Sequence, residues 1–96
     1  MSKSTFSFEY TVFCQTLKDL RLRAEITQTD LAARLGHPQS HVSKFEAGER
    51  RLDVIETMAI CGAIGVPFAD FVSEFTSRLR DKQKGRSTRS RRGVGK

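Results

Sequence analysis

The sequence predicts an all-α fold of five short helices, on three observations. Apolar residues recur three and four positions apart along most of the chain, which is the period of a helix that covers one side of a core. Glycine, proline and capping residues interrupt this period at short intervals. No alternating pattern typical of strands is present, and 96 residues are enough for one modest hydrophobic core.

The first helix is expected to begin at Phe8, because Ser7 before it can accept a hydrogen bond from an N–H group of the first turn. Its inward face carries apolar residues spaced three and four apart: Tyr10, Phe13, Leu17, Leu20 and Ala24. Thr27, with Asp30 three residues later, marks the start of a second helix, which Gly36 ends in a left-handed turn. The inward residues of this helix are Leu31, Ala32 and Leu35.

Pro38 favours the opening of a third helix over the continuation of the second, and Gly48 ends it. The inward residues of the third helix are Val42 and Phe45. Asp53, with Glu56 three residues later, predicts the start of a fourth helix, which Gly65 ends. The fourth helix is expected to turn four residues inward: Val54, Met58, Cys61 and Ile64.

Pro67 opens a fifth helix that is expected to reach Leu79. The apolar residues on its inward face are Phe68, Phe71, Val72 and Phe75. Beyond about Asp81 the chain has one aliphatic residue and no periodicity, so it cannot bury enough surface to offset its ordering entropy. We therefore expect a folded domain over residues 1–79 and a flexible, disordered basic tail over residues 80–96.

The net charge of +6 is concentrated in this tail. Residues 80–96 hold eight of the 17 lysines and arginines but only one of the 11 acidic residues, so the folded part is close to neutral. The basic excess alone therefore does not show that the folded part binds nucleic acid. Three interpretations of the tail stay open: a solvated terminus, an arm that follows DNA phosphates or enters a minor groove, or a segment for RNA or acidic proteins.

Several classes of protein are disfavoured. No apolar run is long enough to span a membrane and the N-terminal residues lack the layout of a secretory signal, so we expect a cytoplasmic protein with Cys14 and Cys61 as reduced core residues. His37 and His41 have the spacing of two metal ligands, but His37 lies in the turn before the helix and no third ligand is apparent. No catalytic constellation is evident, so we expect no enzyme, cofactor, metal site or small-molecule substrate.

Residues 28–47 have the composition of a helix-turn-helix unit, in which a small residue (Ala32) lets two helices approach and Gly36 makes the turn. The stretch LRLRAEITQTDLAARLGHPQSHVSKFEAGERRLDVIE, with TQ, LA, LG, VSK and ExG at fixed offsets, resembles the phage-repressor-like (Xre/Cro type) helix-turn-helix family. The likeness continues through AICGAIGVPFADFV and covers about residues 13–72. It implies a compact lambda-repressor-like DNA-binding domain that regulates transcription.

A rotation of 100° per residue separates the two faces of the third helix. Its exposed face carries side chains that can read base edges in the major groove: Gln39, Ser40, Ser43 and Lys44. The resemblance implies that Gln28 binds a phosphate and braces this recognition helix, and that Arg21 and Glu46 form a structural ion pair. Further candidates for phosphate contacts and positioning are Thr27, His41, Arg50 and Arg51.

The leading interpretation is a sequence-specific regulator, a repressor, that binds a palindromic operator as a homodimer and is associated with the nucleoid when bound. The candidate dimer surface is the apolar face of the last helix, with packing beneath the first helix as the competing explanation: Phe71, Phe75 and Leu79. Alternatives are an antitoxin, a controller protein of a restriction system, or a protein-interaction (coactivator) module. Pro38 departs from the family, which usually has a serine or threonine cap at this helix start.

Overall fold

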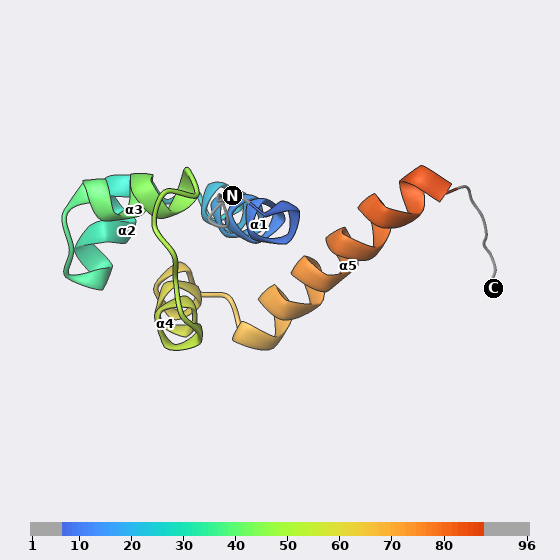
Figure 1. Cartoon of the computed structure of the whole chain (residues 1–96). Helices are drawn as coiled ribbons and strands as arrows, with labels where there is room; N and C mark the ends of the chain where they lie inside the picture. Colours follow the sequence, from blue (N-terminus) through green and yellow to red (C-terminus); the bar gives the residue numbers. More distant parts are fainter. Residues whose placement is uncertain (1–6, 88–96) are drawn as a thin grey trace.

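Five α-helices joined by short turns make up the chain in a computed structural model, which describes residues 7–87 and their side chains as far as Asp81 (Figure 1). The helices are α1 (Phe8–Arg23), α2 (Gln28–Leu35), α3 (Gln39–Glu46), α4 (Val54–Ile64) and α5 (Phe68–Ser87). No strand occurs within residues 7–87, so the all-α prediction is confirmed. Over the same residues no single helix is long and apolar enough to cross a membrane, and α4 with α5 reaches that length only as a pair bent by 108°.

Local capping chemistry sets most helix ends. Three helices begin at a capping side chain: Ser7, Thr27 and Asp53. Asp53 and Glu56 form a full capping box, with 2.7 Å from Glu56 N to Asp53 Oδ1 and 2.9 Å from Asp53 N to Glu56 Oε1. By contrast, α3 begins after Pro38 with no side-chain cap. Glycines at positive φ follow α2, α3 and α4: Gly36, Gly48 and Gly65.

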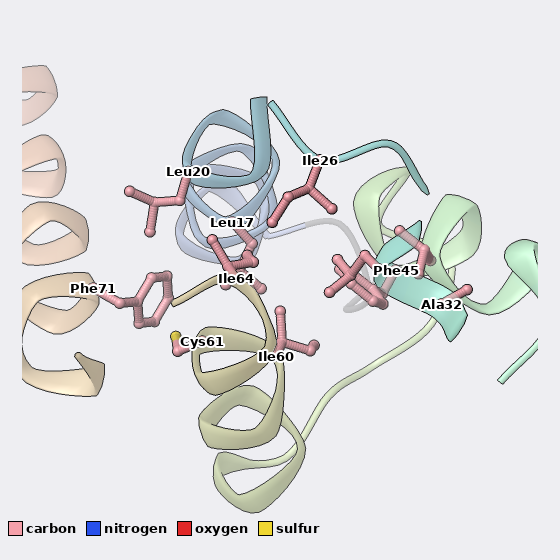
Figure 2. Close-up of a cluster of buried hydrophobic side chains, with 11 residues drawn as sticks. Leu17, Leu20, Ile26, Ala32, Phe45, Ile60, Cys61, Ile64 and Phe71 are labelled. Carbon is pink, nitrogen blue, oxygen red and sulfur yellow. The ribbon is translucent and has the colours of Figure 1, made fainter. Parts of the chain in front are cut away.

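One hydrophobic cluster joins all five helices (Figure 2). The residues labelled there are Leu17, Leu20, Ile26, Ala32, Phe45, Ile60, Cys61, Ile64 and Phe71. Both cysteines, Cys14 and Cys61, are buried free thiols, as the sequence predicts. Burial raises the pKa of Cys61 to about 11, so this thiol stays protonated and unreactive at neutral pH.

The buried face of α4 differs from the predicted one. The sequence pattern places Val54 and Met58 inside, but these residues are 62% and 47% exposed. The residues that α4 buries are Thr57, Ile60, Cys61 and Ile64. The helix is apolar on almost every side, so its sequence does not mark one inward face, and packing against α2 and α5 selects it.

The last helix is longer than the sequence predicts. It continues to Ser87, past the boundary expected at Arg80, and Figure 1 shows its C-terminal turns projecting beyond the other helices. Residues 80–84 are mostly good helix formers, and a helix already nucleated by packing can propagate through them without an apolar stripe. Residues 88–96, the rest of the predicted tail, lie outside the described residues.

The aromatic residues of α5 pack beneath α1. Phe71 is only 2% exposed, and its ring meets the Phe13 ring edge-on at 5.4 Å between centroids. Phe75 meets Phe13 in the same way at 5.5 Å. Phe71 therefore belongs to the core and not to a dimer surface, because the competing explanation, packing beneath the first helix, accounts for it. Only partial exposure remains at Phe75 and Leu79.

Candidate nucleic-acid interface

The helices α2 and α3 form a helix-turn-helix unit and lie together at one end of the molecule (Figure 1). Gly36 takes a left-handed φ of 75°, and the N–H of His37 donates to the carbonyl of Ala32 at 2.9 Å. Ala32 itself is buried, so its small side chain lies in the core that α2 shares with α3. The turn at Gly36 therefore sets the orientation of α3 relative to α2.

The outer face of α3 is polar. Val42 and Phe45 are completely buried, which anchors the opposite face of the helix in the core. The four residues predicted to read bases lie away from those anchors: Gln39, Ser40 and Lys44 exposed, and Ser43 half-buried. The Ser43 hydroxyl donates to the Ser40 carbonyl at 3.2 Å. The remaining groups on this face, an amide, a hydroxyl and an ammonium, can donate or accept hydrogen bonds from a ligand.

A chain of side-chain hydrogen bonds crosses from α1 to the start of α3. Arg21 forms a bidentate pair with Glu46, with Nε to Oε2 at 2.6 Å and Nη2 to Oε1 at 3.0 Å. Gln28 donates from Nε2 to Glu46 Oε1 at 2.9 Å. Gln39 in turn donates from Nε2 to Gln28 Oε1 at 2.7 Å. The buried ion pair therefore orients Gln28, and Gln28 orients the exposed amide of Gln39.

The ion pair at the base of this chain is almost completely shielded from solvent. The Arg21 and Glu46 side chains are 7% and 4% exposed. The third donor group of Arg21, Nη1, donates to the carbonyl of Ile26 at 2.7 Å. Both charges thus have several hydrogen-bond partners, which is the condition for a buried pair to be tolerated.

Arg50, in the loop between α3 and α4, is paired within the protein. Its Nη2 lies 2.6 Å from Glu56 Oε2, while Glu56 Oε1 accepts from the N–H of Asp53. Glu56 therefore caps α4 and holds Arg50 at the same time. The sequence indicates Arg50 as a phosphate contact but gives no sign of this pair, because the three residues between Arg50 and α4 are irregular and have no fixed geometry.

Tyr10 links α1 to the same loop. Its hydroxyl donates to the Arg50 carbonyl at 2.7 Å and accepts from the Leu52 N–H at 3.0 Å. The guanidinium carbon of Arg51 lies 4.3 Å from the centroid of the Tyr10 ring, a cation–π contact. The sequence places Tyr10 only on the inward stripe of α1. In the sequence, only the hydroxyl of Tyr10 hints at this link, because a tyrosine on a buried face needs a hydrogen-bond partner.

His37 and His41 stack on each other at the start of α3. Their ring centroids are 4.1 Å apart with 18° between the planes, and His41 also meets Phe45 edge-on at 5.7 Å. Burial lowers the pKa of His41, as do the charges of His37 and Arg50, whereas Glu56 opposes the shift. Among the described residues, no group of three or more His, Cys, Asp or Glu side chains is placed to hold a metal ion.

Comparisons with known proteins agree on one fold. A family profile for helix-turn-helix proteins, HTH_3, matches residues 17–71. An XRE-family like protein from Pseudomonas syringae pv. tomato str. DC3000 is 47% identical, with a TM-score of 0.68 over 73% of this chain and 85% of that chain. No curated protein matches the sequence.

Two more distant structures share the fold at low identity. The restriction-modification controller protein C.Esp1396I, solved as a tetramer in complex with its natural 35 base-pair operator, is 23% identical, with a TM-score of 0.73 over 78% of this chain and 99% of that chain. The clp gene regulator ClgR from Corynebacterium glutamicum is 20% identical, with a TM-score of 0.70 over 82% and 86% of the two chains.

The crossed pair α2–α3 and the polar outer face of α3 define a helix-turn-helix DNA-binding domain. The chain belongs to the HTH_3 helix-turn-helix family, in its XRE group. Members of this group are DNA-binding transcriptional regulators and not enzymes.

Proposed function

We propose that this protein is a sequence-specific repressor that reads the DNA major groove with α3. The observation that carries the proposal is the hydrogen bond from Gln39 to Gln28, which holds an exposed amide in one orientation at the N-terminal end of α3. In a helix-turn-helix domain these N-terminal residues of the second helix reach the base edges. A preoriented amide loses less entropy when it binds a base.

Each exposed side chain of α3 has a matching base. One N–H of Gln39 donates to Gln28, and its other N–H and its carbonyl oxygen suit adenine N7 and N6. Lys44 suits guanine O6 and N7, and Ser40 and Ser43 can contact either kind of base. Gln39 and Lys44 therefore carry most of the proposed sequence preference.

Phosphate contacts would place α3 in register. The N-terminus of α2, with Thr27 and Gln28, offers backbone N–H groups and the positive end of a helix dipole to a phosphate. His41 and the two arginines of the following loop, Arg50 and Arg51, supply further positive or hydrogen-bonding groups. Such contacts are independent of sequence, and they set position while α3 sets specificity. We infer repression because a small domain bound to a promoter excludes polymerase without further contacts.

A second copy of the chain is the proposed protein partner, and its proposed seat is a groove between α4 and α5, whose floor includes the buried Phe71. The groove has a volume of about 260 Å³, and its lining includes Val54, Val72 and Phe75. Val54 is largely exposed, as is Ile55 beside it on α4. One patch thus offers both a hollow and protruding apolar groups, which is what a two-fold self-complementary contact needs. Because α3 is not part of the patch, both copies keep their DNA-reading faces.

The DNA-binding proposal is tested by fluorescence anisotropy with duplex DNA from around the protein's own gene, at two salt concentrations. Saturable binding that resists nonspecific competitor and is lost in Gln39→Ala/Lys44→Ala is the expected result. Binding that is weak, salt-labile and unchanged in the double variant would show that α3 does not read DNA sequence. That result would favour the alternative of a protein-interaction module, since the α4–α5 groove also suits an apolar segment of another protein.

The dimer surface is tested by sedimentation equilibrium of Val54→Asp. A charge in the groove should shift the protein from dimer to monomer, because pairing would bury it unpaired. Leu22→Asp is the matched control, since Leu22 is an exposed leucine of α1 outside the groove. A monomeric wild-type protein at micromolar concentration, or equal effects of both substitutions, would contradict the proposed surface.

A further inference from the structure

Tyr10 connects the N-terminal part of α1 to the loop of residues 49–53, called here the 49–53 loop, across 40 residues of sequence. Its hydroxyl lies between the carbonyl of Arg50 and the N–H of Leu52, and it satisfies both backbone groups at 2.7 and 3.0 Å. In a loop, backbone carbonyl and N–H groups such as these have no partner in a helix or sheet. The phenol oxygen of Tyr10 supplies both partners and thereby holds the backbone on both sides of Arg51.

The ring of Tyr10 supports the side chain of Arg51 as well. The guanidinium carbon lies 4.3 Å from the ring centroid. The ring is itself held in place, because it stacks with Phe13 at 5.2 Å and 22°, and Phe13 packs on Phe71 of the core. Burial raises the pKa of Tyr10 to about 12, so the hydroxyl stays a hydrogen-bond donor throughout the physiological range.

We propose that Tyr10 is a positioning residue for DNA-backbone contacts: it holds the 49–53 loop and the Arg51 guanidinium at the end of the recognition helix. This inference rests on the proposed function, since it requires that the loop meets phosphate. An arginine on a free loop must lose rotamer and backbone entropy when it binds, whereas an arginine laid on a fixed ring has already lost most of it. Tyr10 therefore acts through Arg51 and does not itself touch DNA.

The test is a double-mutant cycle on DNA affinity between Tyr10 and Arg51. Tyr10→Phe removes the hydroxyl and keeps the ring, Tyr10→Leu removes both, and each is made with and without Arg51→Ala. We expect Tyr10→Phe to weaken binding about 3- to 10-fold, which is the worth of one or two net hydrogen bonds, and Tyr10→Leu to weaken it further. The loss should be the same on specific and unrelated DNA, because phosphate contacts carry no sequence information.

Two features separate positioning from general destabilisation. Tyr10→Leu should lower the salt slope by about 1, as Arg51→Ala does, because one DNA phosphate is then no longer neutralised. In the Arg51→Ala background the effect of Tyr10→Leu should shrink several-fold, since its target is gone. Equal effects of Tyr10→Leu with and without Arg51, or an unchanged salt slope, would overturn the proposal. If Tyr10→Leu does not fold, Tyr10→Phe carries the same cycle.

Ile64→Val is the control for stability, because it trims the core of α4 and leaves the loop untouched. It should lower the unfolding temperature and leave affinity and salt slope unchanged, and an affinity loss as large as that of the Tyr10 variants would overturn the proposal. If the Tyr10 variants are neutral while Gln39→Ala/Lys44→Ala loses binding, only this inference fails. If the wild-type protein binds DNA without sequence preference, the proposed function fails while the cycle still tests this inference, and if it binds no DNA at all, both fail.

Discussion

Glu25 closes α1 in the left-handed conformation, with a φ of 60° that residues with a Cβ adopt at a cost. Its N–H donates to Leu22 O and the N–H of Ile26 donates to Arg21 O, which is the closing pattern that glycine usually serves. We expect Glu25→Gly to raise the free energy of unfolding in urea by about 0.5–1 kcal/mol, because relief of the strain exceeds the added chain entropy. As the control, Gly36→Ala should lower the free energy of unfolding, because Gly36 has a φ of 75°. A loss of stability in Glu25→Gly would show that Glu25 is not strained.

His41 makes the stability of the fold depend on pH. Burial, then His37 and Arg50, lower its pKa in the folded protein, and Glu56 only partly opposes this. The unfolded chain therefore takes up a proton that the folded chain does not, so the stability linked to His41 is complete above about pH 6.5 and is lost as the pH falls below that value. We expect the free energy of unfolding to decrease less from pH 7 to pH 5 in His41→Gln than in the wild type. Parallel urea titrations measure this, and identical pH profiles would contradict it.

Among the elements, helix ends are predictable from sequence because caps act over three or four residues. Ser7 and Asp53 bond to the first turns of their own helices, so their roles can be read locally. The polar face of α3 is likewise predictable, since helix rotation alone separates it from the buried face. Which face of a helix is buried is harder to predict from the sequence. α4 is apolar on most sides, and only its neighbours decide that Val54 faces out. The Tyr10 link to Arg50 spans 40 residues, and no local pattern encodes such a contact.

The Arg21–Glu46 pair couples α1 to α3, so its loss should weaken the whole domain. Because both side chains are more than nine-tenths buried, Arg21→Ala or Glu46→Ala leaves an unpaired buried charge and should cost about 3–5 kcal/mol. The double variant should cost clearly less than the sum of the two, measured by urea unfolding. Arg23→Ala is the control, since the Arg23–Glu74 pair is exposed and should be worth under about 1 kcal/mol. Additive losses would show that the two charges do not depend on each other.

In the sequence of the whole molecule, the basic excess lies after Leu79, outside the helix-turn-helix unit. α5 reaches Ser87, and residues 88–96 still hold four lysines and arginines. We expect removal of residues 88–96 to weaken binding to every DNA sequence alike and to lower the salt slope by about 1 for each phosphate that these residues neutralise. Anisotropy titrations of the truncated protein at several salt concentrations measure both quantities. Unchanged affinity and slope would assign residues 88–96 no part in binding.

Selection of binding sites from a random duplex library shows whether α3 reads DNA sequence. The wild-type protein should enrich an inverted repeat with half-sites about one helical turn apart, roughly 34 Å, because the proposed dimer through the α4–α5 groove would present two α3 helices. Gln39→Ala/Lys44→Ala should lose that repeat while it keeps weak, salt-sensitive binding. Enrichment of the same repeat by the double variant, or no enrichment by the wild type, would contradict the account.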